Sequence, residues 1–196
     1  MQDFSLYFEL GWQHILDWRG YDHILFVLVL CVSYMLSEWP KVLILVTAFT
    51  IGHSITLALS VFNLVHIQTT LIEFLIPVTV LLTAFSNLIN KKPRKKGLRI
   101  QYFLALFFGL IHGMGFSNYL KSLLGKSTNV ASELLAFNIG LEAAQLIIVL
   151  CILIISFILV NFIKIKQRDW TFFLSSAIFG ISLMMTIERL SAIIKI

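Results

Sequence analysis

Charged side chains are scarce in this chain. Asp, Glu, Lys and Arg make up 13% of its 196 residues, against about 25% in a typical soluble domain. Apolar residues make up 59%, the mean hydropathy is +0.92, and only two residues are cysteine. So little cysteine excludes a disulfide-stapled scaffold, and no polar stretch is long enough for a separate soluble domain. The composition predicts one integral membrane domain over residues 1–196.

Six apolar runs have about the 20 residues that a helix needs to cross a ~30 Å hydrocarbon core. They predict an all-α, polytopic membrane bundle of six transmembrane helices over residues 20–193. The expected spans are Gly20–Leu36, Val42–Phe62, Thr70–Ile89, Ile100–Leu120, Glu133–Phe162 and Thr171–Ile193. Ahead of them, in residues 1–19, Phe4, Phe8 and Trp12 recur every four residues, which predicts a short amphipathic helix lying on the membrane interface.

The distribution of Lys and Arg predicts the orientation of these spans. If the N-terminus is outside, the inner segments hold ten of the fifteen basic residues, six of them within residues 91–99. We therefore expect an N-out, C-out protein of the bacterial inner (cytoplasmic) membrane. The basic cluster at 91–99 is then a cytoplasmic loop rather than a nucleic-acid patch.

Ionisable side chains within the spans gather in the predicted outer half of the bilayer. His23, His53, His112 and Glu142 all fall there, and groups of this kind are costly at membrane depth unless they face one another, a cavity or an ion. The predicted inner half holds almost none. The pattern predicts a polar pocket that opens outward and is sealed by apolar helix on the cytoplasmic side.

Two further candidates lie near the start of the first span. Asp22 precedes His23 directly, so their side chains diverge by about 100° on a helix. Asp22 could ligate an ion, cap the helix or orient an imidazole. His14 could fold over the pocket or simply lie at the interface.

The second and fourth spans carry further patterns around their histidines. Thr50, His53 and Thr56 recur every three residues and share a stripe. Gly109 and Gly113 are four residues apart, a spacing that lets neighbouring helices approach closely. A hydrogen bond between helices is the alternative explanation for a histidine at mid-membrane.

The fifth span carries one polar stripe on an otherwise apolar helix. Asn138, Glu142 and Gln145 lie at i, i+4 and i+7. A buried carboxylate without a partner is protonated or needs a cation, and histidines at similar depth suggest a metal ion. A ladder of hydrogen bonds between helices is the alternative.

Imidazoles and carboxylates together form a mixed nitrogen and oxygen ligand set. Such sets suit Ni²⁺, Co²⁺, Zn²⁺ or Fe²⁺, and no thiol is placed to help. The candidate metal ligands are His14, Asp22, His23, His53, His112 and Glu142. The candidate outer partners of these ligands are Thr50, Thr56, Asn138 and Gln145.

Four stretches resemble the HupE/UreJ family, and more closely its second branch. They are GYDHILF (20–26), FTIGHSITL (49–57), HGMGF (112–116) and FNIGLEAAQ (137–145). Family members are linked to hydrogenase and urease maturation. The resemblance implies a nickel or cobalt permease with the Asp-His segment in the ion path. Seven residues separate His14 from Asp22 here, where the permease-type signature has five.

Three functions fit these patterns. The preferred one is a permease that carries a divalent metal inward. The second is a zinc-dependent intramembrane hydrolase at the outer leaflet, with Glu142 or Asp22 as general base and Ser54 or Ser117 as a polar helper. The third is a non-enzymatic membrane subunit that docks a protein partner or a second copy.

Overall fold

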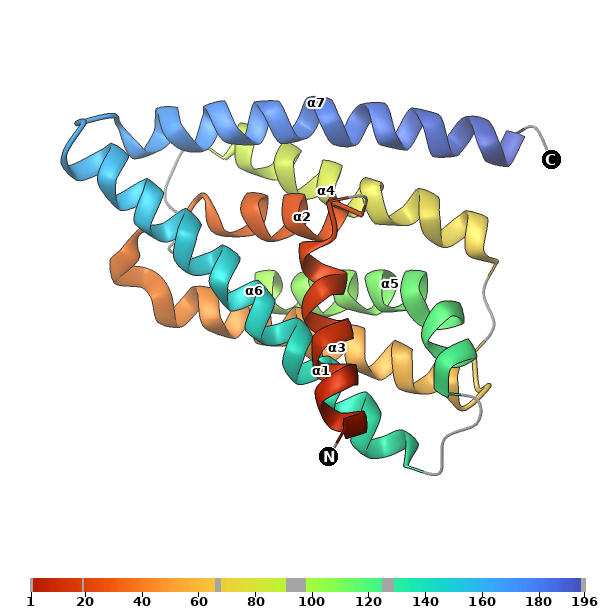
Figure 1. Cartoon of the computed structure of the whole chain (residues 1–196). Coiled ribbons are helices and arrows are strands. Elements are labelled where there is room, and N and C mark those ends of the chain that lie inside the picture. Colours follow the sequence, from red (N-terminus) through yellow and green to blue (C-terminus); the bar gives the residue numbers. More distant parts are fainter. Residues whose placement is uncertain (1, 19, 66–67, 91–97, 125–128, 195–196) are drawn as a thin grey trace.

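The computed structural model describes residues 2–18, 20–65, 68–90, 98–124 and 129–194, and these contain helices and no strand. Figure 1 shows the helices in sequence order. They are α1 (Gln2–Leu16), α2 (Asp22–Cys31), a short 3-10 turn η1 (Leu36–Glu38), α3 (Trp39–Val61), α4 (Thr69–Ile89), α5 (Leu98–Leu124), α6 (Val130–Asn161) and α7 (Gln167–Ile194).

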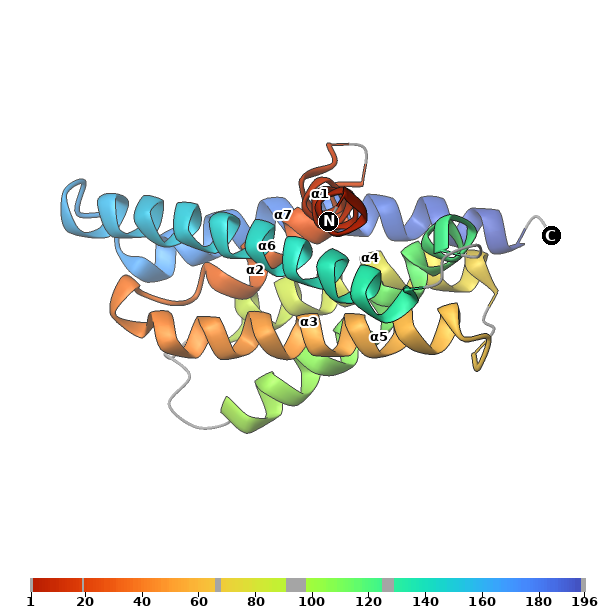
Figure 2. The ribbon, with the colours of Figure 1, turned by 60° about the horizontal axis from the view of Figure 1, so that its bottom comes forward.

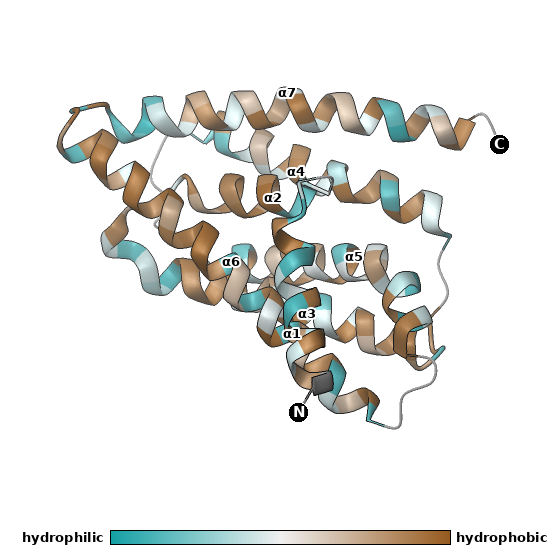
Figure 3. Cartoon of the chain, in the orientation of Figure 1, coloured by the Kyte–Doolittle hydropathy of each residue, from teal (hydrophilic) through white to brown (hydrophobic). Residues whose placement is uncertain are grey.

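Five of these helices, α3 to α7, are long and apolar enough to cross a membrane. Each agrees with an expected span to within four residues at either end. Hydrophobic residues run along the long helices, and hydrophilic ones gather at the turn between α6 and α7 (Figure 3). The chain is therefore a multi-pass membrane protein. Residues 91–97 of the expected basic loop lie outside the described residues, and the N-out orientation stays a prediction.

The first expected span, Gly20–Leu36, is wrong in its length, because the helix found there is too short to cross the membrane. Its helix α2 has ten residues, which is about 15 Å of helix, half of the ~30 Å core. The backbone turns after α2, where the carbonyl of Val32 accepts hydrogen bonds from Thr171 Oγ1 and Gln167 Nε2, both at 3.2 Å. Side chains of α7 thus satisfy backbone that leaves the helix, which makes a short helix tolerable at membrane depth.

The N-terminal helix is present as predicted, but it packs into the bundle. It crosses α6 (Figures 1 and 2) and buries Tyr7 and Ile15, while Phe4 stays exposed. A Cβ on Gly11 would overlap a carbonyl of α6, and one on Gly140 would overlap a carbonyl of α1. Glycine at both positions lets the two backbones touch, and this contact fixes the end of α1 that carries His14.

A second close crossing joins α3 and α5, the most extensively packed helix pair. A Cβ on Gly52 would overlap the carbonyl oxygen of Leu106, and one on Gly113 would overlap that of His53. This confirms the close packing that the glycine spacing predicts for the fourth span. Because Gly52 precedes His53 and Gly113 follows His112, the crossing holds these two histidines at the centre of the bundle.

Candidate metal centre

Three imidazoles from three different helices meet beside the α1–α2 turn. His14 lies in the last turn of α1, His23 is the second residue of α2 and His53 lies midway along α3. One ring nitrogen from each lies within 4.8 Å of the other two. Nitrogens bound to one tetrahedral ion at about 2.0–2.1 Å lie roughly 3.4 Å apart, so small side-chain movements would close this three-imidazole group on an ion.

His112 of α5 stands next to the three-imidazole group. Its ring centroid is 5.1 Å from that of His23, which in turn lies 4.7 Å from His14 and 5.8 Å from His53. His53 and His112 have no exposed surface, and His23 retains 4%. The four histidines thus form one cluster with His23 at its middle.

Hydrogen bonds fix the tautomer of two of these rings. Nδ1 of His23 donates to Asp22 Oδ1 at 3.1 Å, which leaves the lone pair on Nε2. Thr79 Oγ1 donates to the carbonyl of Ile76 and therefore accepts from Nε2 of His112 at 2.8 Å, which leaves the lone pair on Nδ1. An outer partner on one ring nitrogen commonly orients a metal-binding histidine through the other.

Five ring nitrogens of the cluster are buried and have no hydrogen-bond partner: His14 Nε2, His23 Nε2, His53 Nδ1, His53 Nε2 and His112 Nδ1. Each buried unsatisfied polar atom costs about 1–3 kcal/mol, so their concentration at one point calls for a ligand. Burial, then the neighbouring His23, lowers the pKa of His14 well below its usual value, which favours the neutral form that binds metals. The cluster therefore fits a divalent transition-metal ion.

An open cleft of about 650 Å³ reaches His14 from the surface. Its lining includes Asp17 and Gln13 together with the aromatic rings of Trp18 and Phe116. The Phe116 ring packs 4.0 Å from that of His14, and both residues line the cleft. A hydrated cation has a route to the cluster along this side.

The polar stripe of α6 meets α3. Glu142 Oε1 accepts a hydrogen bond from Thr47 Oγ1, and Gln145 Oε1 accepts one from Thr50 Oγ1, both at 2.8 Å. These bonds are the interhelical ladder that the sequence offers as an alternative to metal binding. Glu142 is not among the three-imidazole group, and its role as a ligand stays a prediction.

The remaining candidates bond within their own helices. Asn138 Nδ2 donates to the carbonyl of Leu134, and Thr56 donates to backbone carbonyls of α3. Ser54 and Ser117 likewise donate to carbonyls one turn earlier. Asp22 Oδ1 accepts a hydrogen bond from the backbone N–H of His23 at the start of α2, at 2.9 Å, and the same oxygen also holds the His23 ring.

Sequence reasoning missed Thr79 and Phe116. Thr79 bonds to His112 from α4, a helix for which no polar pattern was expected. Thr79, Thr83 and Ser86 lie at i, i+4 and i+7, and this spacing was the available signal. Phe116 looked like one more apolar residue, and only the fold brings it to His14.

The comparisons with known proteins agree with the resemblance in the sequence. The family model described as HupE / UreJ protein matches residues 1–189, nearly the whole chain. No curated protein and no solved structure matches the chain. With this match over a multi-pass fold and its histidine cluster, the chain belongs to the HupE/UreJ family.

Proposed function

We propose that this protein is a permease that carries a divalent transition-metal ion, nickel or cobalt, across the bacterial inner membrane. The observation that carries the proposal is the set of buried, unpartnered imidazole nitrogens in the middle of a bundle of spanning helices. Imidazole suits Ni²⁺ and related divalent ions of the later transition series. The family supports a role in nickel or cobalt handling.

The ion enters through the cleft beside His14. Asp17 lines that cleft, and acidic side chains at a cleft attract cations. The ion then exchanges its waters for nitrogens of the three-imidazole group. Asp22 does not contact the ion. It orients the ring of His23 by accepting a hydrogen bond from Nδ1.

Uptake by proteoliposomes tests the proposal. Liposomes that contain the purified chain accumulate radioactive nickel, and His23→Ala and His53→Ala each reduce the initial rate at least about 10-fold, because each removes one ligand. Ser182→Ala is the matched control, since Ser182 is equally buried but bonds only to carbonyls of α7. Uptake no faster than through empty liposomes would contradict the proposal.

A zinc-dependent hydrolase is the second candidate, and one observation favours it. Three histidines with an open fourth position are the ligand set of a catalytic zinc, and the cleft gives a substrate access to it. The hydroxyls of Ser54 and Ser117, however, are engaged by their own helices. Tightly held, stoichiometric zinc together with no nickel uptake would favour the hydrolase over the permease.

A further inference from the structure

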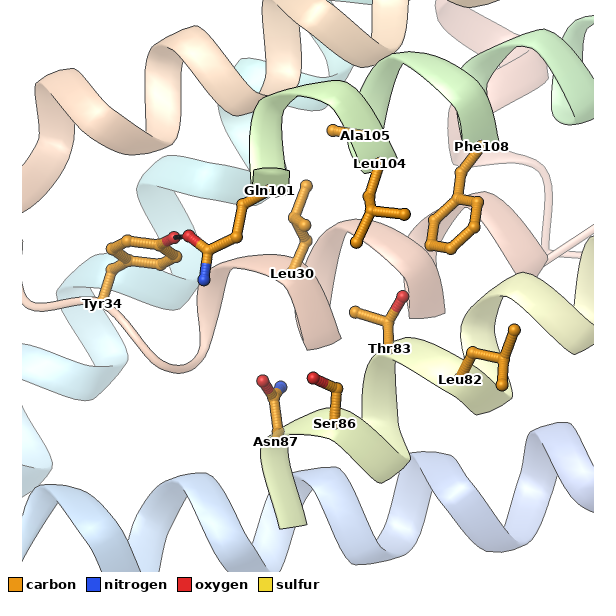
Figure 4. Close-up of a pocket in the computed structure, with 10 residues that line it drawn as sticks. All are labelled: Leu30, Tyr34, Leu82, Thr83, Ser86, Asn87, Gln101, Leu104, Ala105 and Phe108. Carbon is orange, nitrogen blue, oxygen red and sulfur yellow. Dashed lines mark hydrogen bonds between the residues drawn. The ribbon is translucent and has the colours of Figure 1, made fainter. Parts of the chain in front are cut away.

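A second cavity lies in the half of the bundle opposite the cleft. It has a volume of about 210 Å³ and is formed between the end of α2, the end of α4 and the start of α5 (Figure 4). Since one water needs about 10–15 Å³ of such volume, the cavity has room for several. Its polar lining residues are Tyr34, Thr83, Ser86, Asn87 and Gln101.

The sequence predicts that the half toward residues 91–99 is sealed by apolar helix, and this stays a prediction, although five of the ten residues that line the cavity are polar. The polar side chains there are uncharged, which is why ionisable residues did not reveal them. Among the described residues that line the cavity, none carries a carboxylate, an imidazole or a cationic group. A divalent ion would find oxygen atoms there but no group that holds it strongly.

Hydroxyl groups on α4 lead from the histidine cluster to this cavity. Thr79 accepts from His112, and Thr83, one turn further along α4, lines the cavity. Both threonines donate their own protons to carbonyls of α4. Each oxygen keeps at least one lone pair, since Thr79 uses only one of its two for His112, and these lone pairs can accept from the waters of a hydrated ion.

His112 connects this hydroxyl row to the three-imidazole group. Its unpartnered Nδ1 is buried, and its ring lies 5.1 Å from that of His23. An ion that leaves the three-imidazole group toward α5 can therefore exchange one nitrogen for another before it reaches oxygen. Conduction requires several sites, each weak enough to release the ion, and the change from imidazole to hydroxyl supplies that gradient.

We infer that His112, Thr79 and Thr83 carry the ion from the three-imidazole group into this cavity, which is a water-filled exit toward the α4–α5 end of the bundle. The inference rests on the proposed transport function and adds the path by which the ion leaves the three-imidazole group. The ion crosses from a cleft at His14, through imidazole nitrogens, to an uncharged exit whose lining combines five polar and five apolar residues.

Thiol labelling tests whether the cavity holds water. Single cysteines replace Thr83 or Ser86 in a Cys151→Ala background, in which the remaining Cys31 is fully buried. The matched control is Phe85→Cys, because Phe85 lies between these positions at the same depth but is 49% exposed on the outer surface of α4. Charged, membrane-impermeant thiol reagents react with thiolates in contact with water.

We expect Thr83→Cys and Ser86→Cys to react at least about 10-fold faster than Phe85→Cys when reagent is added on the side of the α4–α5 loop. Equal, slow reaction of all three variants would overturn the inference. That result is also expected if a lipid acyl chain fills the cavity.

A transport measurement separates this inference from the proposed function. Thr83→Val keeps the shape of the side chain and removes the hydroxyl, so nickel affinity stays within about 2-fold while uptake falls about 10-fold. Thr186→Val is the control, since Thr186 makes the same own-helix bond on α7. Normal uptake by Thr83→Val overturns the exit path alone. Absence of uptake by the wild-type chain overturns both proposals.

Discussion

The two halves of the bundle carry different polar chemistry. Beside the cleft, buried imidazole nitrogens have no hydrogen-bond partners. Around the second cavity, Thr83 and Asn87 are bonded to carbonyls of the protein. The first arrangement is built to gain a ligand, and the second is stable without one. In the proposed transport, binding and release therefore occur at places that differ in residue type rather than in charge alone.

The largest effect should come from breaking the crossing that assembles the first half. Gly52→Ala drives a Cβ into the backbone of α5, and no side chain can move to relieve it. The cost should exceed the ~1–3 kcal/mol of an ordinary overpacked core, and metal binding should be lost. Thermal unfolding and a metal titration measure the two effects.

Gly180→Ala is the control for this change. A Cβ on Gly180 meets nothing within 4 Å, so the same substitution in α7 should leave folding and binding intact. If Gly52→Ala binds metal as well as Gly180→Ala does, the crossing does not position the cluster.

Lowering the pH should release the metal ion from the three-imidazole group and should leave the second cavity unchanged. Metal binds neutral imidazole, so protons compete for the ligand nitrogens as the pH falls. Because the pKa of His14 is lowered, binding should persist at pH 6, where free imidazole with a pKa of about 6.5 is mostly protonated, and fail only at lower pH. Metal titrations at a series of pH values would show this. Loss of binding already at or above pH 6 would contradict it.

A smaller effect is expected from the outer partner of His23. Asp22→Asn keeps an oxygen near Nδ1 but removes the negative charge that holds the ring. Outer partners of this kind are worth about 10- to 100-fold in metal affinity, and we expect a loss in that range without unfolding. Asp169→Asn, on the exposed first turn of α7, is the control for charge alone.

Glu142→Gln should have the smallest effect if the hydrogen bond from Thr47 is its main role. A glutamine retains an oxygen that accepts this bond, so metal affinity should change less than about 2-fold. A loss as large as that of His53→Ala would instead establish Glu142 as a ligand, as the sequence predicts.

Features that depend on long-range contacts could not be predicted from the sequence, whereas features set by local hydropathy could. The five long helices follow from apolar runs alone, because the bilayer sets their length. The end of α2 does not follow from apolar runs, because the carbonyl of Val32 accepts hydrogen bonds from side chains of α7, more than a hundred residues away in the sequence. A helix prediction from local hydropathy has no access to that contact.

The candidate metal centre likewise combines residues that the sequence identifies with residues that only the fold identifies. The histidines were identifiable because ionisable groups stand out in apolar runs, and His14 joins them through a glycine crossing that no local pattern reveals. Thr79 and Thr83 were missed since hydroxyls are common in membrane helices. Their proposed role depends on two features of the fold: Thr79 contacts His112, and Thr83 lines the second cavity.

Titration of the purified chain with nickel is the most direct test of the three-imidazole group. We predict about one divalent ion per chain and at least a 100-fold loss of affinity in a folded His53→Ala variant. Equal affinity in the wild type and the variant, or no binding by the folded wild-type chain, would contradict the account.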